Sequence, residues 1–109
     1  MNSPNSIKAV NLLTMCRKAG RMVMGFDPVK DALELGKAFC VLTATDISPK
    51  TLKEVNYVCE RNDVTHFDIE TDMDTLHNAL GKRVGVIAIC DAGFAKKFKK
   101  MFETNNTNS

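Results

Sequence analysis

Apolar residues recur along the chain at two spacings, one typical of helices and one typical of strands. The helical spacing, three or four positions, occurs in residues 6–20, 27–37, 48–63, 72–82 and 91–102. Shorter apolar segments of strand length lie between them, at residues 21–24, 38–44, 64–69 and 84–90. Because strands that alternate with helices form a sheet covered on both faces, the pattern predicts an α/β fold. We expect one domain over residues 1–102 and a disordered polar tail over residues 103–109.

Polar residues at the helix boundaries refine these elements. We expect Asp27 to cap the second helix, with Pro28 at its first position, and Ser48 to cap the third. The buried face of the first helix is predicted to contain Ile7, Val10, Leu13 and Cys16. The buried face of the third helix is predicted to contain Leu52, Val55 and Cys59.

The composition fits a single compact domain of 109 residues, 44% of which are hydrophobic. A net charge of +2 and a pI of about 8.4 are too mildly basic to indicate nucleic acid by themselves. No apolar run is long enough to cross a bilayer, and the first residues lack a signal-peptide pattern, so we expect a soluble, cytoplasmic protein. The wide spacing of the cysteines favours buried free thiols over a metal or redox site: Cys16, Cys40, Cys59 and Cys90.

The sequence offers little support for enzymatic chemistry. It has no glycine-rich phosphate-binding fingerprint, and His66 and His77 fall outside the known cysteine–histidine signatures. Asp27 and Asp31 form an i, i+4 pair that could serve acid–base chemistry, but the helix dipole also favours acids at a helix start. We therefore expect a protein that is not an enzyme and uses no cofactor or metal ion.

Basic residues are spread over several segments. The densest run is "KKFKK", residues 96–100, which is typical of a solvated helix face, with an RNA-binding patch as the alternative. Other cations lie at helix ends and turns: Arg17, Lys18, Arg21, Lys82 and Arg83. Because such positions can converge in space, they are compatible with a nucleic-acid surface that has no contiguous charge run.

The order of several short motifs resembles a known family. These motifs are "RKAGR", "GFD", "ATDISPKT", "LGK" and "DAGFAKK", spread between Ile7 and Phe102. Together they resemble the kink-turn-binding ribosomal proteins, which include archaeal and eukaryotic large-subunit proteins and the box C/D core protein. The bacterial YlxQ-type branch looks nearest. The resemblance implies a three-layer α/β/α sandwich with a mixed four-stranded sheet, and non-catalytic binding of structured, kink-turn-like RNA.

The resemblance also implies where that RNA would bind. In the family, the start of the second helix reads guanine edges beside tandem sheared G·A pairs, and the loop before the last strand packs on a protruding nucleotide. The residues then expected to contact RNA are Arg21, Gly25, Phe26, Asp27, Lys30, Asp31, Asp46, Lys82, Arg83 and Val84. The implied partners are ribosomal RNA and other ribosomal or ribonucleoprotein components, with the chain acting as a monomer away from membranes.

Three positions of the implied site depart from the family pattern. Asp27 stands at the position of an Asn, Pro28 at that of a Glu, and Asp31 at that of a Lys. Lys30 compensates in part, from a position rotated by about 100° around the helix. An acidic helix start suits a basic partner, so the alternative is a protein-interaction module that has lost specific RNA reading. Phe26 either stacks on a base or packs as a staple against its own helix.

Overall fold

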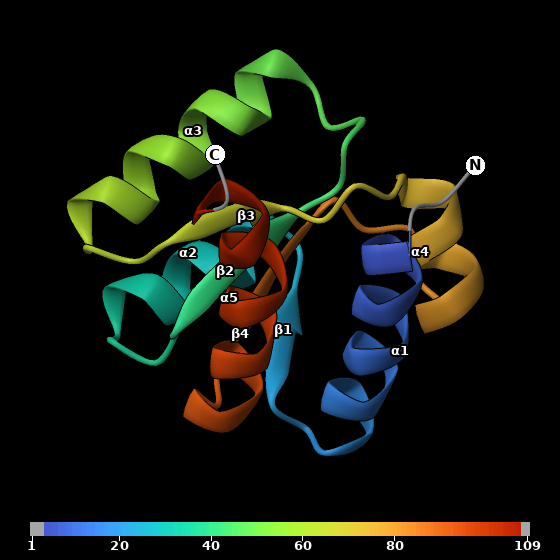
Figure 1. Ribbon diagram of the computed structural model, residues 1–109. Helices are drawn as coiled ribbons and strands as arrows, with labels where there is room; N and C mark the ends of the chain where they lie inside the picture. Colours follow the sequence, from blue (N-terminus) through green and yellow to red (C-terminus); the bar gives the residue numbers. More distant parts are fainter. Residues whose placement is uncertain (1–3, 108–109) are drawn as a thin grey trace.

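The computed structural model describes residues 4–107 of the chain, drawn in colour in Figure 1. The elements in this part are α1 (Pro4–Lys18), β1 (Met22–Met24), α2 (Phe26–Glu34), β2 (Cys40–Thr43), α3 (Pro49–Arg61), β3 (His66–Asp68), α4 (Met73–Leu80), β4 (Val86–Ile89) and α5 (Ala92–Thr107). The alternation of helices and strands expected from the apolar pattern is confirmed. No helix among the described residues is long and apolar enough to span a membrane.

The four strands form one mixed sheet in the order β1-β4-β2-β3. Strand β4 pairs antiparallel with both β1 and β2, whereas β2 and β3 run parallel. The two central strands are buried at every position, as expected for strands covered on both faces. This arrangement confirms the mixed four-stranded sheet that the resemblance implied.

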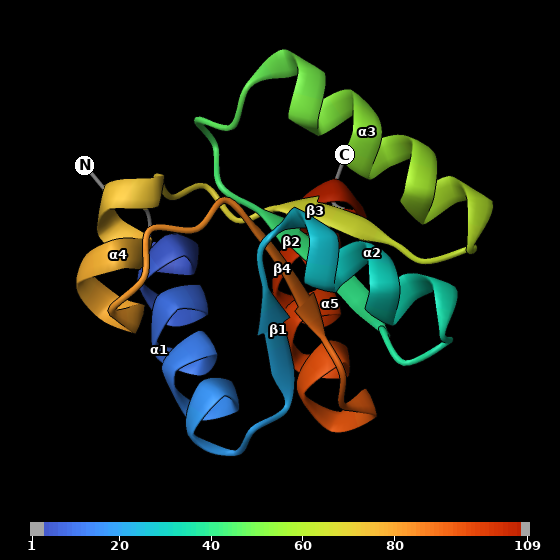
Figure 2. The same cartoon turned by 180° about the vertical axis from the view of Figure 1, so that it is seen from behind.

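Helices cover both faces of the sheet and complete a three-layer sandwich. The hydrophobic cluster on one face joins α1, α4 and α5 to the sheet, and Figure 1 views the molecule from this side. The cluster on the other face joins α2 and α3 to the sheet, and Figure 2 shows α2 in front of the strands, with α3 at the top of the view. The predicted α/β/α architecture is therefore confirmed.

The buried faces of two helices differ in detail from the sequence prediction. The core face of α1 consists of Ser6, Ala9, Leu12, Leu13 and Cys16, whereas Ile7 is 53% exposed. In α3, Leu52 is 38% exposed and Val58 is buried in its place. In both helices the buried stripe lies at a different angle around the helix axis from the one predicted. In α1, the small side chain of Ala9 supplies a core position that the larger Ile7 was expected to fill.

The predicted cap is confirmed for α3 and is wrong for α2. Ser48 caps α3 as predicted, its hydroxyl accepting the Thr51 N–H at 3.1 Å. Asp27 does not cap α2, because that helix begins at Phe26, two residues earlier than expected, and Gly25 is the residue at its cap. The closing helix α5 continues to Thr107 and so includes residues 103–107 of the expected disordered tail. Residues 108 and 109 lie outside the described residues.

Candidate nucleic-acid interface

A hollow of about 380 Å³ lies at the end of the sheet where β1 leads into α2 and β4 begins. Four segments form it: the start of α2, the loop that leads into α3 with the first turn of α3, the start of α4, and the connection between α4 and β4. Its lining residues are Gly25, Phe26, Ile47, Ser48, Thr51, Met73, Lys82, Arg83, Val84, Gly85 and Val86. The structure thus brings together Gly25, Phe26, Lys82, Arg83 and Val84 of the expected RNA-contacting residues.

Gly25 joins the start of α2 to the central strand β4. Its N–H donates to the Val86 carbonyl at 2.8 Å, and its own carbonyl accepts the Val29 N–H at 3.0 Å. Its φ of 102° lies in a region that glycine adopts freely and other residues avoid. Glycine offers no side-chain acceptor, and no side chain caps this helix. The first backbone N–H groups of α2 therefore remain available to a ligand at the edge of the hollow.

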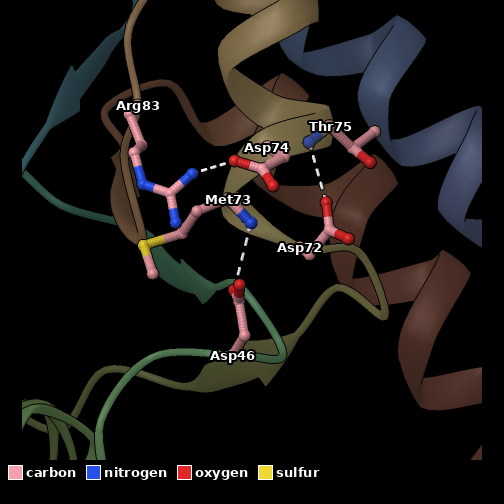
Figure 3. Close-up of polar contacts among 6 residues, drawn as sticks. All are labelled: Asp46, Asp72, Met73, Asp74, Thr75 and Arg83. Carbon is pink, nitrogen blue, oxygen red and sulfur yellow. Dashed lines mark hydrogen bonds and ion pairs between the residues drawn. The ribbon is translucent and has the colours of Figure 1, made fainter.

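Lys82, Arg83 and Val84 approach the hollow from the opposite side. Lys82 and Arg83 are exposed, whereas Val84 is only 4% exposed and belongs to the hydrophobic core. The Arg83 guanidinium forms an ion pair with Asp74 at the start of α4 (Figure 3). Because both side chains of this pair are more than half exposed, a ligand phosphate can compete with Asp74 for Arg83.

Asp46 holds the loop before α3 against the start of α4. Its carboxylate accepts the Met73 N–H at 3.0 Å, beside the cap in which Asp72 accepts the Thr75 N–H at 2.7 Å (Figure 3). This backbone hydrogen bond from Thr75 is the main reason why the pKa of Asp72 lies below its usual value. Asp46 thus positions the wall of the hollow, and its carboxylate already accepts a hydrogen bond from the protein.

Asp27, Lys30 and Asp31 are exposed along α2 and lie outside the lining of the hollow. Lys30 instead lines a neighbouring groove of about 440 Å³ between α2 and α3. The other residues of this groove are Phe26, Glu34, Lys53, Glu54, Tyr57, Val58 and Arg61. Phe26 is half-buried, packs against the α2–α3 cluster and separates the groove from the hollow.

Arg21 lies apart from the other candidate residues. Its carbonyl accepts the Cys90 N–H at 2.8 Å and the Cys16 thiol at 3.4 Å, at the end of β1 opposite Gly25. Four residues of extended chain correspond to about 13 Å between the two ends. Arg17 lies at the end of α1, beside the end of α4. Its Nη1 lies 3.7 Å from the place that a Cβ on Gly81 would occupy, next to Lys82.

The family model described as "Ribosomal protein L7Ae/L30e/S12e/Gadd45 family" matches residues 8–99. The chain belongs to this family. Within it, the hollow lies between the two segments from which the resemblance predicted RNA contacts, the start of α2 and the residues before β4. Thr51 and Met73 also line the hollow and were not predicted, since only the folded chain brings α3 and α4 to this place.

Individual relatives agree with this membership. The chain is 32% identical to "RNA-binding protein YlxQ" of Enterococcus faecium over 94% of this chain and 99% of that protein. It is 36% identical to "Large ribosomal subunit protein eL30B" of Schizosaccharomyces pombe over 84% of this chain and 78% of that protein.

Two solved structures share the fold. A protein of unknown function from Bacillus halodurans has a TM-score of 0.79 at 24% identity, with 86% of this chain and 95% of that chain covered. The 15.5kD RNA binding protein of Giardia lamblia has a TM-score of 0.73 at 19% identity, with 93% and 92% covered. At these identities the likeness concerns the fold alone.

The two histidines of the protein, His66 and His77, do not line the hollow. His66 Nε2 is 2.7 Å from Thr43 Oγ1 inside the sheet, and burial lowers the pKa of its imidazole. His77 is exposed on α4. No group of three or more possible metal ligands occurs among residues 4–107.

The cysteines are free thiols in the described part of the chain. Burial raises the pKa of Cys40 to about 12 and the pKa of Cys16 and Cys59 to about 11. Cys90 is only half-buried, and burial raises its pKa as well. Elevated pKa values keep these sulfurs protonated and therefore poorly nucleophilic.

Proposed function

We infer that the protein binds structured RNA without catalysing a reaction, as a cytoplasmic monomer associated with ribosomal RNA, and that the hollow is its RNA site. One observation carries this proposal: the hollow joins the free start of α2 to the cations Lys82 and Arg83 in one concave surface. The names of two relatives, an RNA-binding protein and a large ribosomal subunit protein, support the same class of ligand.

The chemistry of the hollow suits an RNA backbone with a displaced nucleotide. Uncapped N–H groups at a helix start and exposed basic side chains both bind phosphate oxygens. Phe26 presents an aromatic ring between the hollow and the groove, where an unstacked base can pack. The exposed Asp27 carboxylate can accept hydrogen bonds from guanine amino groups.

A kink-turn is the RNA structure that we propose for this site. Asp27 and Asp31 place negative charge beside the phosphates, so we expect weaker binding than a Lys at position 31 would give. Titration of a kink-turn RNA, and of a matched RNA whose G·A pairs are replaced by Watson–Crick pairs, measures the specificity directly. Preference for the kink-turn supports the proposal. Equal weak binding of both RNAs would leave only a general RNA-binding protein.

Arg83 provides the sharpest test of the site. Arg83→Gln should weaken kink-turn binding and reduce the slope of log K against log salt by about 1, the value for one lost phosphate contact. Arg61→Gln removes the same charge from the far end of α3 and serves as the control. If both variants bind RNA like the unaltered protein, the hollow is not the RNA site. Recovery of one specific protein partner together with no salt-sensitive RNA binding would favour the interaction module instead.

A further inference from the structure

The charges of the protein are divided unequally between its helices. Helix α1 contains three basic residues and no acid, and α5 contains four lysines and the single acid Glu103. Seven cations against one acid give these two helices a formal charge of +6. The whole chain carries +2, so the rest of the molecule carries −4. The basic character of the protein therefore comes entirely from two elements.

These two helices are neighbours on one face of the sheet. Asn5 Nδ2 at the start of α1 donates to the Met101 carbonyl late in α5, at 3.4 Å. Arg21, just after α1, accepts the N–H of Cys90, just before α5. The helices therefore run antiparallel, as Figure 1 shows. The exposed basic residues of this α1–α5 face are Lys8, Lys18, Lys96, Lys97 and Lys100, whereas Arg17 lies on the other flank of α1, beside Gly81 at the end of α4.

Favourable charge pairs along the helix do not account for Lys96 and Lys97 of α5. The helix dipole favours cations in the last turn, as for Arg17 and Lys18 in α1, but Lys96 and Lys97 lie in the first half of α5. Neither has an acidic residue three or four positions away along the helix, and Lys96 has Lys100 four positions on. Like charges at this spacing destabilise a helix by a few tenths of a kcal/mol. The concentrated positive charge therefore destabilises the helix slightly, and binding of an anionic partner would offset this cost.

We propose that the α1–α5 face binds the phosphate backbone of a second RNA segment, so that the protein holds RNA on two faces at once. The identity of the partner rests on the proposed function, because an RNA in the hollow brings further phosphates close to a domain only 35 × 33 × 30 Å in extent. Phe98 is buried and the half-buried Phe94 ring has the Lys97 ammonium over it at 6.0 Å, so this face lacks an open stacking surface. Contacts here are with phosphates and independent of sequence.

The test compares three double variants for binding to a plain RNA duplex, which lacks a kink-turn. The first, Lys96→Gln with Lys97→Gln, removes two charges from the α1–α5 face. The second, Lys82→Gln with Arg83→Gln, alters the hollow. The third, Lys53→Gln with Arg61→Gln, removes two exposed charges from α3 in the opposite layer and is the control. Circular dichroism verifies that each variant is folded.

We expect the first variant to weaken duplex binding and to lower the log–log salt slope by roughly 2, at about 0.9 for each phosphate contact. The α3 control variant should retain duplex binding, and the Lys82/Arg83 variant should lose less duplex affinity than the Lys96/Lys97 variant. With the unaltered protein, energy transfer between a labelled kink-turn RNA and a labelled duplex should report that both are held together. The Lys96/Lys97 variant should lose this signal while it still binds the kink-turn.

Unchanged duplex affinity and slope in the Lys96/Lys97 variant would overturn the inference. So would an acidic peptide that binds this face under conditions where the duplex does not, since the partner would then be a protein. The proposed function fails separately: its failure appears as kink-turn binding that is insensitive to Lys82 and Arg83. In that case, loss of duplex binding in the Lys96/Lys97 variant would still support the α1–α5 face as an RNA-binding surface.

Discussion

Replacing Gly85 with alanine tests how rigid the floor of the hollow is. A Cβ at this position would lie 2.4 Å from Ile47 Cγ2 and 3.1 Å from Met73 Sδ. The thioether of Met73 is flexible and can move aside, but Cγ2 of Ile47 is fixed close to its backbone. The loop that carries Ile47 must therefore shift, and Asp46 resists this shift because its carboxylate is hydrogen-bonded to the Met73 N–H.

Overpacking of this kind costs about 1–3 kcal/mol of unfolding free energy. An unfolding entropy of about 2.1 cal/mol/K per residue gives a 109-residue chain roughly 0.23 kcal/mol/K. A loss of about 2 kcal/mol then lowers the Tm by roughly 9 °C. Thermal unfolding followed by circular dichroism, with urea denaturation for the free energy, measures both quantities.

A double-mutant cycle with Ile47→Ala identifies the cause. Removing Cγ2 relieves the clash, so the combined variant should be more stable than the sum of the two single changes predicts, by about 0.5–3 kcal/mol. Gly85→Ala with a stability within about 0.5 kcal/mol of the unaltered protein would refute the reasoning, since the loop before α3 would then move freely. A cycle without coupling would show that the cost arises elsewhere than at Ile47.

Three further predictions concern single side chains. Asp31→Lys should strengthen kink-turn binding roughly tenfold, about 1.4 kcal/mol, whereas Glu34→Lys, the same charge change three residues further along α2, should have a much smaller effect in the same titration. Burial lowers the pKa of His66 in the folded protein, so the unfolded chain binds the proton more readily and stability should fall as the pH drops below about 6.5. His66→Gln should flatten that part of the curve of urea stability against pH, and an unchanged curve would contradict the assignment. In thiol titration of the folded protein with a disulfide reagent, Cys90 should react first and the other three cysteines only after unfolding, whereas simultaneous reaction of all four would argue against their burial.

The order of elements could be predicted because it depends on local patterns. Continuous apolar runs identified the buried strands β2 and β4, and Ser48 marked a helix start through the chemistry of its own hydroxyl. Asp27 was wrongly expected to cap α2, since residue preferences rank Asp as a good cap. The backbone at Gly25, with a φ of 102°, instead leads the chain into the helix two residues earlier than expected.

The candidate site was harder to predict from the sequence than the fold. Two of the segments that form the hollow, the start of α2 and the residues before β4, came from the resemblance, because nothing local connects Gly25 with Lys82 across more than fifty residues. Arg21 was grouped with them by its charge, but the length of β1 places it at the other end of the strand. Thr51 and Met73 depend on how α3 and α4 pack, which no spacing within either helix specifies.

The hydrogen bond from the Gly25 N–H to the Val86 carbonyl ties the start of α2 to one of the two central strands of the sheet. A helix end on an ordinary surface loop frays many times for each global unfolding event. Here the Gly25 amide can exchange with solvent only when its bond to Val86, at the start of β4, opens. The surface offered to a ligand is thus maintained by the stability of the whole fold, and little conformational entropy remains to be lost when it is occupied.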